Sequence, residues 1–288
     1  MRKVFKYTGI GISAAVLLVV VLIGALFAVG SSKLQRSYQV QLASLVIPSD
    51  SVAIERGAHL SRIYGCTDCH GADLSGKVFV DDPPFRVTAT NLTPGRGGIG
   101  STYTYEDFDR AIRHGIHPSG RSLFIMPSSV FNNMSDEDVS MLIAYLNTIE
   151  PIDTDHPPTE IRPLGRILAS AMIDPAFEVR TGAARAGMTP EIAPTAEYGA
   201  YLSSIVCAHC HGEDLRGIEV PPAPGSPPAP DLAASGQWTN DVFDRALREG
   251  ITPTGRQMDP RFMPWPVTAE MTETEIRAIQ AHLAMLTD

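Results

Sequence analysis

The chain contains four cysteines, and all of them lie in two short motifs of the form Cys-x-x-Cys-His. The motifs comprise Cys66, Cys69 and His70 in the first half and Cys207, Cys210 and His211 in the second. Two thiols one helical turn apart can each bond a vinyl edge of a porphyrin, while the adjacent imidazole reaches the iron from the same side. This spacing is typical of c-type haem attachment. The two motifs therefore predict two covalently bound haems.

Two other uses of paired cysteines are less compatible with this pattern. Two pairs could bind zinc, but such pairs usually lie within about 15–20 residues of each other, and these lie in different halves of the chain. A redox-active pair of the thioredoxin type is found beside a βαβ unit, which neither motif has nearby. The histidine directly after each pair favours haem over both alternatives.

Length and charge limit the classes of protein to consider. A chain of 288 residues is long enough for about two domains, and its 44% hydrophobic content is enough for packed cores. The formal net charge of −9 argues against nucleic-acid binding, which requires a basic surface. Acidic domains instead favour partner proteins with basic docking surfaces.

The N-terminal segment has the composition of a membrane helix. Basic residues at positions 2, 3 and 6 precede an uncharged stretch over residues 8–30, and Lys33 is the next charged residue. This stretch is long enough to cross a bilayer as a helix. We expect residues 1–32 to form an anchor. The early positive charges predict a cytoplasmic N-terminus and place the residues after Lys33 on the outer face. For a bacterial protein we therefore expect a single pass through the inner membrane, with the haem domains on the periplasmic side.

A cleaved signal peptide is the competing interpretation of this segment. Residues 28–30 (Ala-Val-Gly) have the small-x-small form of a processing site. The apolar region of a signal peptide, however, is typically about 7–15 residues long, and this stretch is longer. Its length favours a retained anchor.

The second half of the chain repeats the first. Residues 108–113 (Phe-Asp-Arg-Ala-Ile-Arg) match residues 243–248 (Phe-Asp-Arg-Ala-Leu-Arg), and each run is followed by Gly-Ile and then by Pro-x-Gly-Arg. A Met-Pro pair follows in both halves. A repeat of about 95 residues is the size of a small domain. The expected domains are a tether over residues 33–50, a first domain over 51–150, a proline-rich linker over 151–193 and a second domain over 194–288.

The local patterns within each repeat are helical. Thr104 is suited to cap a helix that ends at Gly115, and residues 240–250 repeat this arrangement. Ser-x-x-Asp at residues 135–138 and Thr-x-x-Glu at residues 272–275 have the form of capping boxes for the last helix of each repeat. A short helix is possible over residues 164–172. Because no convincing alternating pattern of a strand is present, we predict an all-α fold.

This order of motifs resembles two tandem class I cytochrome c domains, over residues 51–150 and 194–288. The closest resemblance is to membrane-anchored cytochromes and to cytochrome subunits of bacterial respiratory chains and membrane-bound dehydrogenases. It implies that the four cysteines are thioether sites and that His70 and His211 are proximal iron ligands. Met126 and Met263, each followed by proline, match the distal methionines of the family. A thioether ligand raises the potential of haem iron, and the proline fixes the backbone beside it.

Other residues near these sites have alternative roles. Methionine more often fills core space than binds a metal, and four others lie near enough to compete, namely Met134, Met141, Met258 and Met271. Their positions in the repeat favour Met126 and Met263 as ligands. Arg121 and Arg256 could pair with haem propionates or remain solvated. The six histidines outside the ligand positions are expected on surfaces or helix faces.

An iron with both axial positions filled has no open position for chemistry. We therefore expect an electron carrier, with no catalytic residue and no small-molecule substrate. It would carry electrons between a membrane or periplasmic donor and a terminal acceptor, with redox proteins or a larger membrane complex as partners. A dihaem peroxidase is the main alternative, since one of its haems binds peroxide. A haem-based sensor is a second alternative, but it would normally require an output domain.

Overall fold

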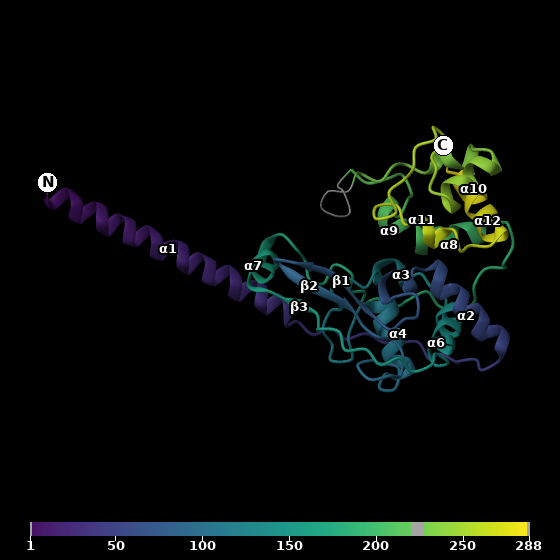
Figure 1. Ribbon diagram of the computed structural model, residues 1–288, viewed down its shortest axis with the longest axis horizontal. Helices are drawn as coiled ribbons and strands as arrows, with labels where there is room; N and C mark the ends of the chain where they lie inside the picture. Colours follow the sequence, from purple (N-terminus) through teal and green to yellow (C-terminus); the bar gives the residue numbers. More distant parts are fainter. Residues whose placement is uncertain (1, 220–226, 287–288) are drawn as a thin grey trace.

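The computed structural model describes residues 2–219 and 227–286. The long helix α1 (Arg2–Leu34) extends away from a mostly helical body (Figure 1). The first repeat contains α2 (Ser51–Ile63), α3 (Cys66–His70), α4 (Tyr105–His114), α5 (Ser128–Phe131) and α6 (Asp136–Leu146). The second contains α8 (Ala196–Val206), α9 (Ala208–His211), the 3-10 helix η1 (Ala233–Gln237), α10 (Asn240–Arg248), α11 (Trp265–Thr268) and α12 (Glu273–Ala284). The linker forms α7 (Pro163–Ala171), close to its predicted range.

The two repeats pack their first and last helices in the same way. Gly57 on α2 lies against the carbonyl of Met141 on α6, and Gly199 on α8 lies against the carbonyl of Ala278 on α12. A Cβ atom on either glycine would overlap that carbonyl. Glycine therefore permits the same close helix crossing in each repeat.

Three of the predicted N-terminal caps form, but α10 starts after Thr239, whose side chain makes no capping hydrogen bond. The Thr104 hydroxyl accepts from the amide of Asp107, and Gly115 ends α4 in the left-handed conformation at φ 65°. Thr272 and Glu275 form a full capping box at the start of α12. At α6 the Ser135 hydroxyl accepts from the amide of Asp138. The Asp138 carboxylate instead accepts from two tyrosine hydroxyls, so this box is one-sided.

The structure is mostly helical, as predicted, and it also contains a small sheet that the sequence did not predict. It is antiparallel, in the order β1 (Lys77–Asp82), β2 (Phe85–Ala89) and β3 (Glu160–Ile161). Strand β1 exposes five of its six residues, so it lacks the alternation of buried and exposed side chains by which a strand is predicted. The short β3 comes from the linker and pairs Ile161 with Phe85. The sheet thereby attaches the linker to the first repeat, beside the base of α1 (Figure 1).

A single cluster of buried side chains runs through both repeats. Tyr198 and Tyr201 of α8 belong to this cluster and are 0% and 2% exposed. Their rings stack with centroids 6.4 Å apart. The two repeats therefore share a core and form one packed body.

Crossed polar contacts join the repeats around this core. Asp138 of the first repeat accepts from Tyr64 Oη at 2.8 Å and from Tyr201 Oη of the second repeat at 2.8 Å. Glu275 of the second repeat accepts from Arg56 Nη1 of the first at 2.8 Å. The acidic residue in the first turn of each last helix thus contacts the other repeat.

Helix α1 ends in a close junction with α7. A Cβ atom on Gly30 would overlap the carbonyl oxygen of Arg166. The Arg166 guanidinium lies over the ring of Phe27 at 5.9 Å from its centroid, and Lys33 Nζ donates to the Ser170 carbonyl at 2.8 Å. The end of α1 is thus fixed to the linker helix.

Candidate haem sites

Both motif histidines are oriented in the same way by a backbone carbonyl. His70 Nδ1 lies 2.7 Å from the carbonyl oxygen of Thr90, and His211 Nδ1 lies 2.8 Å from that of Pro230. Since a carbonyl only accepts, each ring carries its proton on Nδ1. The Nε2 lone pair is then available to a metal, an arrangement common among metal-binding histidines.

Burial keeps the groups of the motifs uncharged. It lowers the pKa of His70 and of His211, which favours the neutral imidazole that can bind iron. Burial also raises the pKa of Cys66 to about 12 and that of Cys207 to about 12. The thiols are therefore protonated, as is expected where they pack among apolar side chains.

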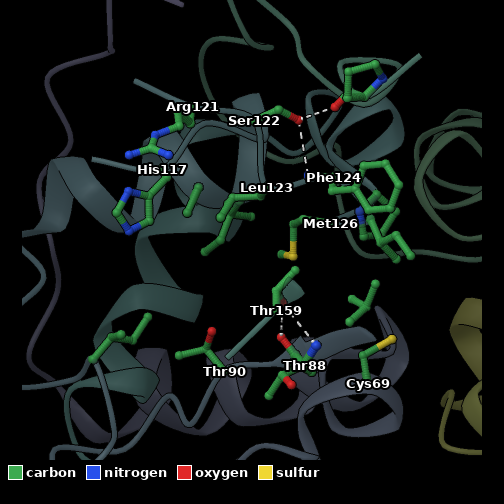
Figure 2. Close-up of a pocket in the computed structure, with 18 of the residues that line it drawn as sticks. Cys69, Thr88, Thr90, His117, Arg121, Ser122, Leu123, Phe124, Met126 and Thr159 are labelled. Atoms are coloured by element: carbon green, nitrogen blue, oxygen red, sulfur yellow. Dashed lines mark hydrogen bonds between the residues drawn. The ribbon is translucent and has the colours of Figure 1, made fainter. Parts of the chain in front are cut away.

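The motif of the first repeat opens onto a large cavity. Its volume is about 550 Å³, and Cys66, Cys69, His70 and Met126 all line it. This volume lies within the range of about 300–1,000 Å³ found for ligand pockets. Figure 2 shows the Met126 sulfur pointing into the cavity, with Cys69 also at its border. The structure thus brings together all four predicted site residues of the first repeat.

The lining of this cavity fits an apolar ring that carries carboxylates. Its apolar walls include Leu92, Phe108, Ile112 and Leu142. Arg121 and His117 lie side by side at one edge (Figure 2). Among the described residues, the lining contains no aspartate or glutamate. A haem has an apolar macrocycle and two propionates, so these residues suit its chemistry.

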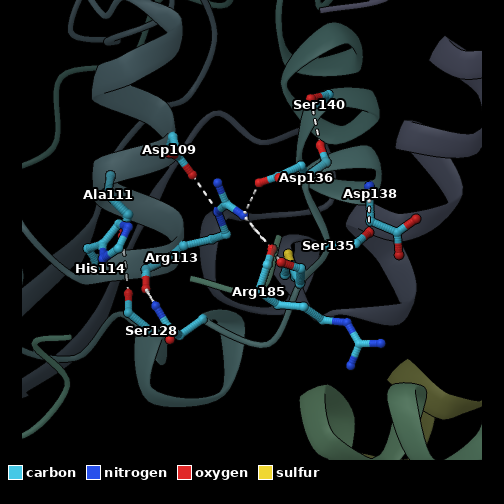
Figure 3. Close-up of polar contacts among 12 residues, drawn as sticks. Asp109, Ala111, Arg113, His114, Ser128, Ser135, Asp136, Asp138, Ser140 and Arg185 are labelled. Carbon is cyan, nitrogen blue, oxygen red and sulfur yellow. Dashed lines mark hydrogen bonds and ion pairs between the residues drawn. The ribbon is translucent and has the colours of Figure 1, made fainter. Parts of the chain in front are cut away.

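Polar contacts fix the helix that follows Met126 (Figure 3). The Ser128 hydroxyl donates to the Ala111 carbonyl at 3.1 Å, and Asn132 Nδ2 donates to the Arg113 carbonyl at 3.0 Å. These bonds hold α5 against α4. The loop that carries Met126 is thereby positioned by backbone groups of a neighbouring helix.

The guanidinium of Arg113 is buried next to this contact between α4 and α5. Its Nε donates to Asp109 at 2.5 Å, and its Nη1 donates to Asp136 at 2.8 Å and to the Arg185 carbonyl at 3.2 Å. Arg113 therefore joins α4, α6 and the linker, as Figure 3 shows.

The second repeat has the same local backbone as the first. The Met126 carbonyl accepts from the amide of Ser128 at 2.7 Å, and the Met263 carbonyl accepts from that of Trp265 at 2.7 Å. The prolines between them have nearly equal dihedral angles, with φ −77° and ψ 54° in the first repeat and φ −76° and ψ 58° in the second. Ligation by Met126 and by Met263 remains a prediction, which this common turn supports.

Two of the competing methionines belong to the core. Met134 is 0% exposed and Met271 is 2% exposed, and both lie in the shared cluster of buried side chains. They fill space among apolar neighbours, which is the usual role of methionine.

Residues outside the predicted first domain also line the cavity. The end of α1 contributes Lys33, the tether contributes Arg36 and Tyr38, and the linker contributes Thr159 and Arg166. Sequence reasoning missed them because their approach depends on tertiary packing. The basic charge of Lys33, Arg36 and Arg166 in an acidic chain was the available signal.

Two histidines make contacts that the sequence did not predict, although His114 lies on α4 and His117 is exposed. His114 is buried rather than on a surface, and its Nδ1 donates to the Arg180 carbonyl at 2.7 Å. His117 lines the cavity.

The cytochrome c family model matches this chain twice, over residues 54–150 and 196–287. The chain is 38% identical over 117 residues to the fructose dehydrogenase cytochrome subunit of Gluconobacter japonicus, which covers 38% of this chain and 24% of that subunit. It is 28% identical over 237 residues to the cytochrome c subunit of the quinone-dependent alcohol dehydrogenase of Gluconobacter oxydans, covering 70% of this chain and 48% of that subunit.

A dihaem relative covers more of the chain. The diheme cytochrome c-type protein of Cereibacter sphaeroides is 26% identical over 256 residues, which is 79% of this chain and 84% of that protein. By contrast, the match spans about a quarter of the fructose dehydrogenase subunit. The two family matches, together with two Cys-x-x-Cys-His motifs set in equivalent surroundings, lead to one conclusion: the chain belongs to the cytochrome c family, and its two domains of that family imply two c-type haems.

Proposed function

We propose that this protein is a membrane-tethered dihaem electron carrier, which passes electrons between a membrane or periplasmic donor and a terminal acceptor. The observation that carries the proposal is the pairing of an oriented histidine with a methionine in a single cavity, at His70 and Met126. Bound haem iron would supply the one-electron change. With both axial positions filled, such an iron transfers electrons and binds no substrate.

The proposed roles of the site residues follow the motifs. Cys66, Cys69, Cys207 and Cys210 hold the haems through thioether bonds. His70 and His211 are the proximal ligands, oriented by the carbonyls of Thr90 and Pro230. Met126 and Met263 are the distal ligands, in two turns of the same backbone geometry.

Contacts between the repeats support electron transfer within the chain. Glu178 accepts from the Ser129 amide of α5 at 2.9 Å and lies 3.7 Å from Nδ1 of His209, inside the second motif. Val267 of α11 lies 3.9 Å from the Cβ position of Gly65, next to Cys66. The helix after each methionine thus lies near the haem motif of the other repeat. This arrangement favours a short path between the two sites.

Retention of α1 as an anchor is part of the proposal. The segment Phe5–Leu34 is long and apolar enough to cross a membrane, a property that a signal sequence shares. The packing of Gly30 against α7 and the bond from Lys33 to Ser170 support retention, because cleavage near residue 30 would remove part of this junction. The anchor would place the haem domains on the periplasmic side of a bacterial inner membrane.

We further propose that the chain serves as the cytochrome subunit of a membrane-bound dehydrogenase or respiratory complex. The similarity to cytochrome subunits of fructose and alcohol dehydrogenases supports this role. Gentle solubilisation of membranes, followed by affinity isolation of the tagged chain, tests it. Co-purification of a dehydrogenase or oxidase subunit is expected. Isolation of the chain without a partner would contradict the proposed role as a subunit of a complex. The protein would then be a mobile electron carrier.

The electron-carrier function has its own test. Protein matured with a haem-attachment system is expected to give two haems per chain in a pyridine haemochrome assay and two reversible one-electron waves. Fewer than two haems would contradict the proposal. Turnover of hydrogen peroxide at the rate of a dedicated peroxidase would contradict it in favour of the enzyme alternative.

A further inference from the structure

The charged side chains that line the cavity of the first repeat are basic, although the chain as a whole is acidic. Lys33, Arg36, Arg121 and Arg166 line it, and among the described residues no acidic side chain does. The whole chain has 23 basic and 32 acidic residues and a net charge of −9. A cavity with only basic charges in an acidic protein indicates a site for a negatively charged group.

Most of this charge comes from outside the first repeat. Lys33 lies in the last turn of α1, Arg36 follows in the tether, and Arg166 belongs to α7. Two hydrogen bonds hold the start of the tether in place. The Tyr38 amide donates to the Gly120 carbonyl at 2.8 Å, and Lys33 Nζ donates to Ser170.

Two of the guanidinium groups are available to a ligand. Within residues 2–219 and 227–286, the side chains of Arg36 and Arg121 make no hydrogen bond or ion pair with the protein. Arg166, in contrast, contacts Phe27 and Ser31. Burial and the nearby Arg121 lower the pKa of His117, so this ring adds no charge of its own at neutral pH.

The second repeat provides an internal comparison. Gly120 and Gly255 occupy the same position in their Pro-x-Gly-Arg loops, with φ 85° and φ 81°. A Cβ atom on Gly120 would overlap the hydroxyl of Ser37 in the tether, whereas no described atom lies within 4 Å of the Cβ position of Gly255. The tether therefore covers a surface of the first repeat that is open in the second.

We propose that the tether is part of the first haem site, and that Arg36 acts with Arg121 to bind the propionates of the haem attached at Cys66 and Cys69. This inference rests on the proposed haem function. A positive charge near the ring favours the reduced iron, because reduction adds an electron. The tether therefore raises the potential of the first haem, and it connects that haem directly to the end of α1.

The test measures both midpoint potentials of the full-length, matured protein by spectroelectrochemistry. Met126→Ala identifies the wave of the first haem. Arg36→Gln and Arg121→Gln are each expected to shift that same wave to lower potential, by up to a tenfold change in the reduction equilibrium. For a one-electron couple, a tenfold change is about 59 mV. Added salt should diminish the shift caused by Arg36→Gln, since this side chain is exposed.

Three control variants distinguish the effect of Arg36 on the first haem potential from a general effect of removing a positive charge. Arg256→Gln, at the equivalent position of the second repeat, is expected to shift the other wave only. Arg96→Gln removes an exposed arginine of the first repeat that does not line the cavity and should shift neither. Arg36→Lys keeps the positive charge, so the midpoint potential of the first haem should stay close to its wild-type value.

A pair of glycine variants tests the position of the tether without changing charge. Gly120→Leu should displace Ser37 and lower the potential of the first haem. Gly255→Leu imposes the same unfavourable φ but meets open space, so it should leave that potential unchanged.

The inference is overturned if Arg36→Gln leaves both potentials at their wild-type values, or if it shifts the same wave as Arg256→Gln. Equal effects of Gly120→Leu and Gly255→Leu on the first wave would also overturn it. A haem count below two per chain would contradict the proposed function itself, and the inference with it. The count is measured independently of the potentials, so the two failures can be distinguished.

Discussion

At the scale of single residues, the surroundings of Met126 differ from those of the fully buried methionines. Met126 points into a cavity, whereas Met134 is 0% exposed among apolar side chains. Loss of a thioether ligand should remove the near-infrared sulfur-to-iron band of one haem. We expect Met126→Ala and Met263→Ala each to remove about half of the band, and the double variant to remove all of it. Loss of the thioether should also lower the corresponding potential.

Met134→Leu is the control for this prediction. It conserves volume in the core, so it should cost less than about 1.5 kcal/mol of stability and leave both bands intact. Persistence of the full band in the double alanine variant would contradict the assignment of Met126 and Met263.

Much of the first site could be predicted from residue types and spacing. The cysteines, His70 and Met126 lie in local motifs, and local motifs are visible in a sequence. The contributions of Arg36 and Arg166 could not be predicted, because they reach the cavity from segments that fold back onto the first repeat. No local pattern encodes such an approach.

At the scale of elements, Arg113 and Arg248 occupy the same position in the two repeats and have different surroundings. The side chain of Arg113 is 0% exposed and pairs with Asp109 and Asp136. The side chain of Arg248 is 34% exposed, and its nearest acidic partner, Glu273, lies 3.9 Å away. Breaking a buried pair leaves an uncompensated charge and costs about 3–5 kcal/mol, whereas an exposed pair contributes about 1 kcal/mol or less.

We therefore expect Arg113→Met to lower the free energy of unfolding by about 3–5 kcal/mol and Arg248→Met to lower it by about 1 kcal/mol or less. Guanidinium chloride titrations of the two variants measure the difference. Adding Asp109→Asn to Arg113→Met should restore part of the loss, because it removes the stranded carboxylate. Equal losses in the two single variants would disprove this account of Arg113.

The helices were more predictable than the sheet. Thr104, Gly115 and Thr272 are capping residues whose preference is local, and each caps a helix in the structure. Strand β3 has two residues and pairs with a strand far away in sequence, so its partner determines its structure.

At the scale of the whole molecule, Glu275 makes the association of the repeats sensitive to acid. Its side chain is 0% exposed and contacts Arg56 and His59 of the other repeat. Burial by itself would raise its pKa, but hydrogen bonds from His59, Arg56 and the Thr272 amide outweigh burial and hold the pKa at about 2. An unfolded glutamate has a pKa of about 4.3.

A pKa that is lower in the folded state stabilises the fold above the unfolded pKa, and this stabilisation is lost as the pH falls towards the folded pKa. The contribution of Glu275 is on the order of 3 kcal/mol, since one pKa unit is about 1.4 kcal/mol. It should decline between about pH 4.5 and pH 2. Unfolding titrations at several pH values are expected to show this decline in the wild type and a flatter profile in Glu275→Gln.

Glu273→Gln is the matched control on the same helix, because the Glu273 side chain is 65% exposed. It should keep the wild-type acid profile. An unchanged acid profile in Glu275→Gln would show that the interface does not depend on this carboxylate. The interface itself could not be predicted, because its partners lie in different repeats and no spacing rule connects them.

With α1 retained as a membrane anchor, as proposed, the close contact of Gly30 with Arg166 would restrict how the protein moves at the membrane. A flexible linker after α1 would let the two haem-binding domains rotate freely relative to the membrane. An anchor helix that packs at its end against α7 would instead fix the tilt of the two domains, so that the same haem edge would face the bilayer throughout diffusion. Gly30→Leu should free this junction between α1 and α7, whereas Gly24→Leu should not, because no described atom lies within 4 Å of the added Cβ. The rate of electron delivery from a membrane donor would then report how much the reaction depends on a fixed approach angle.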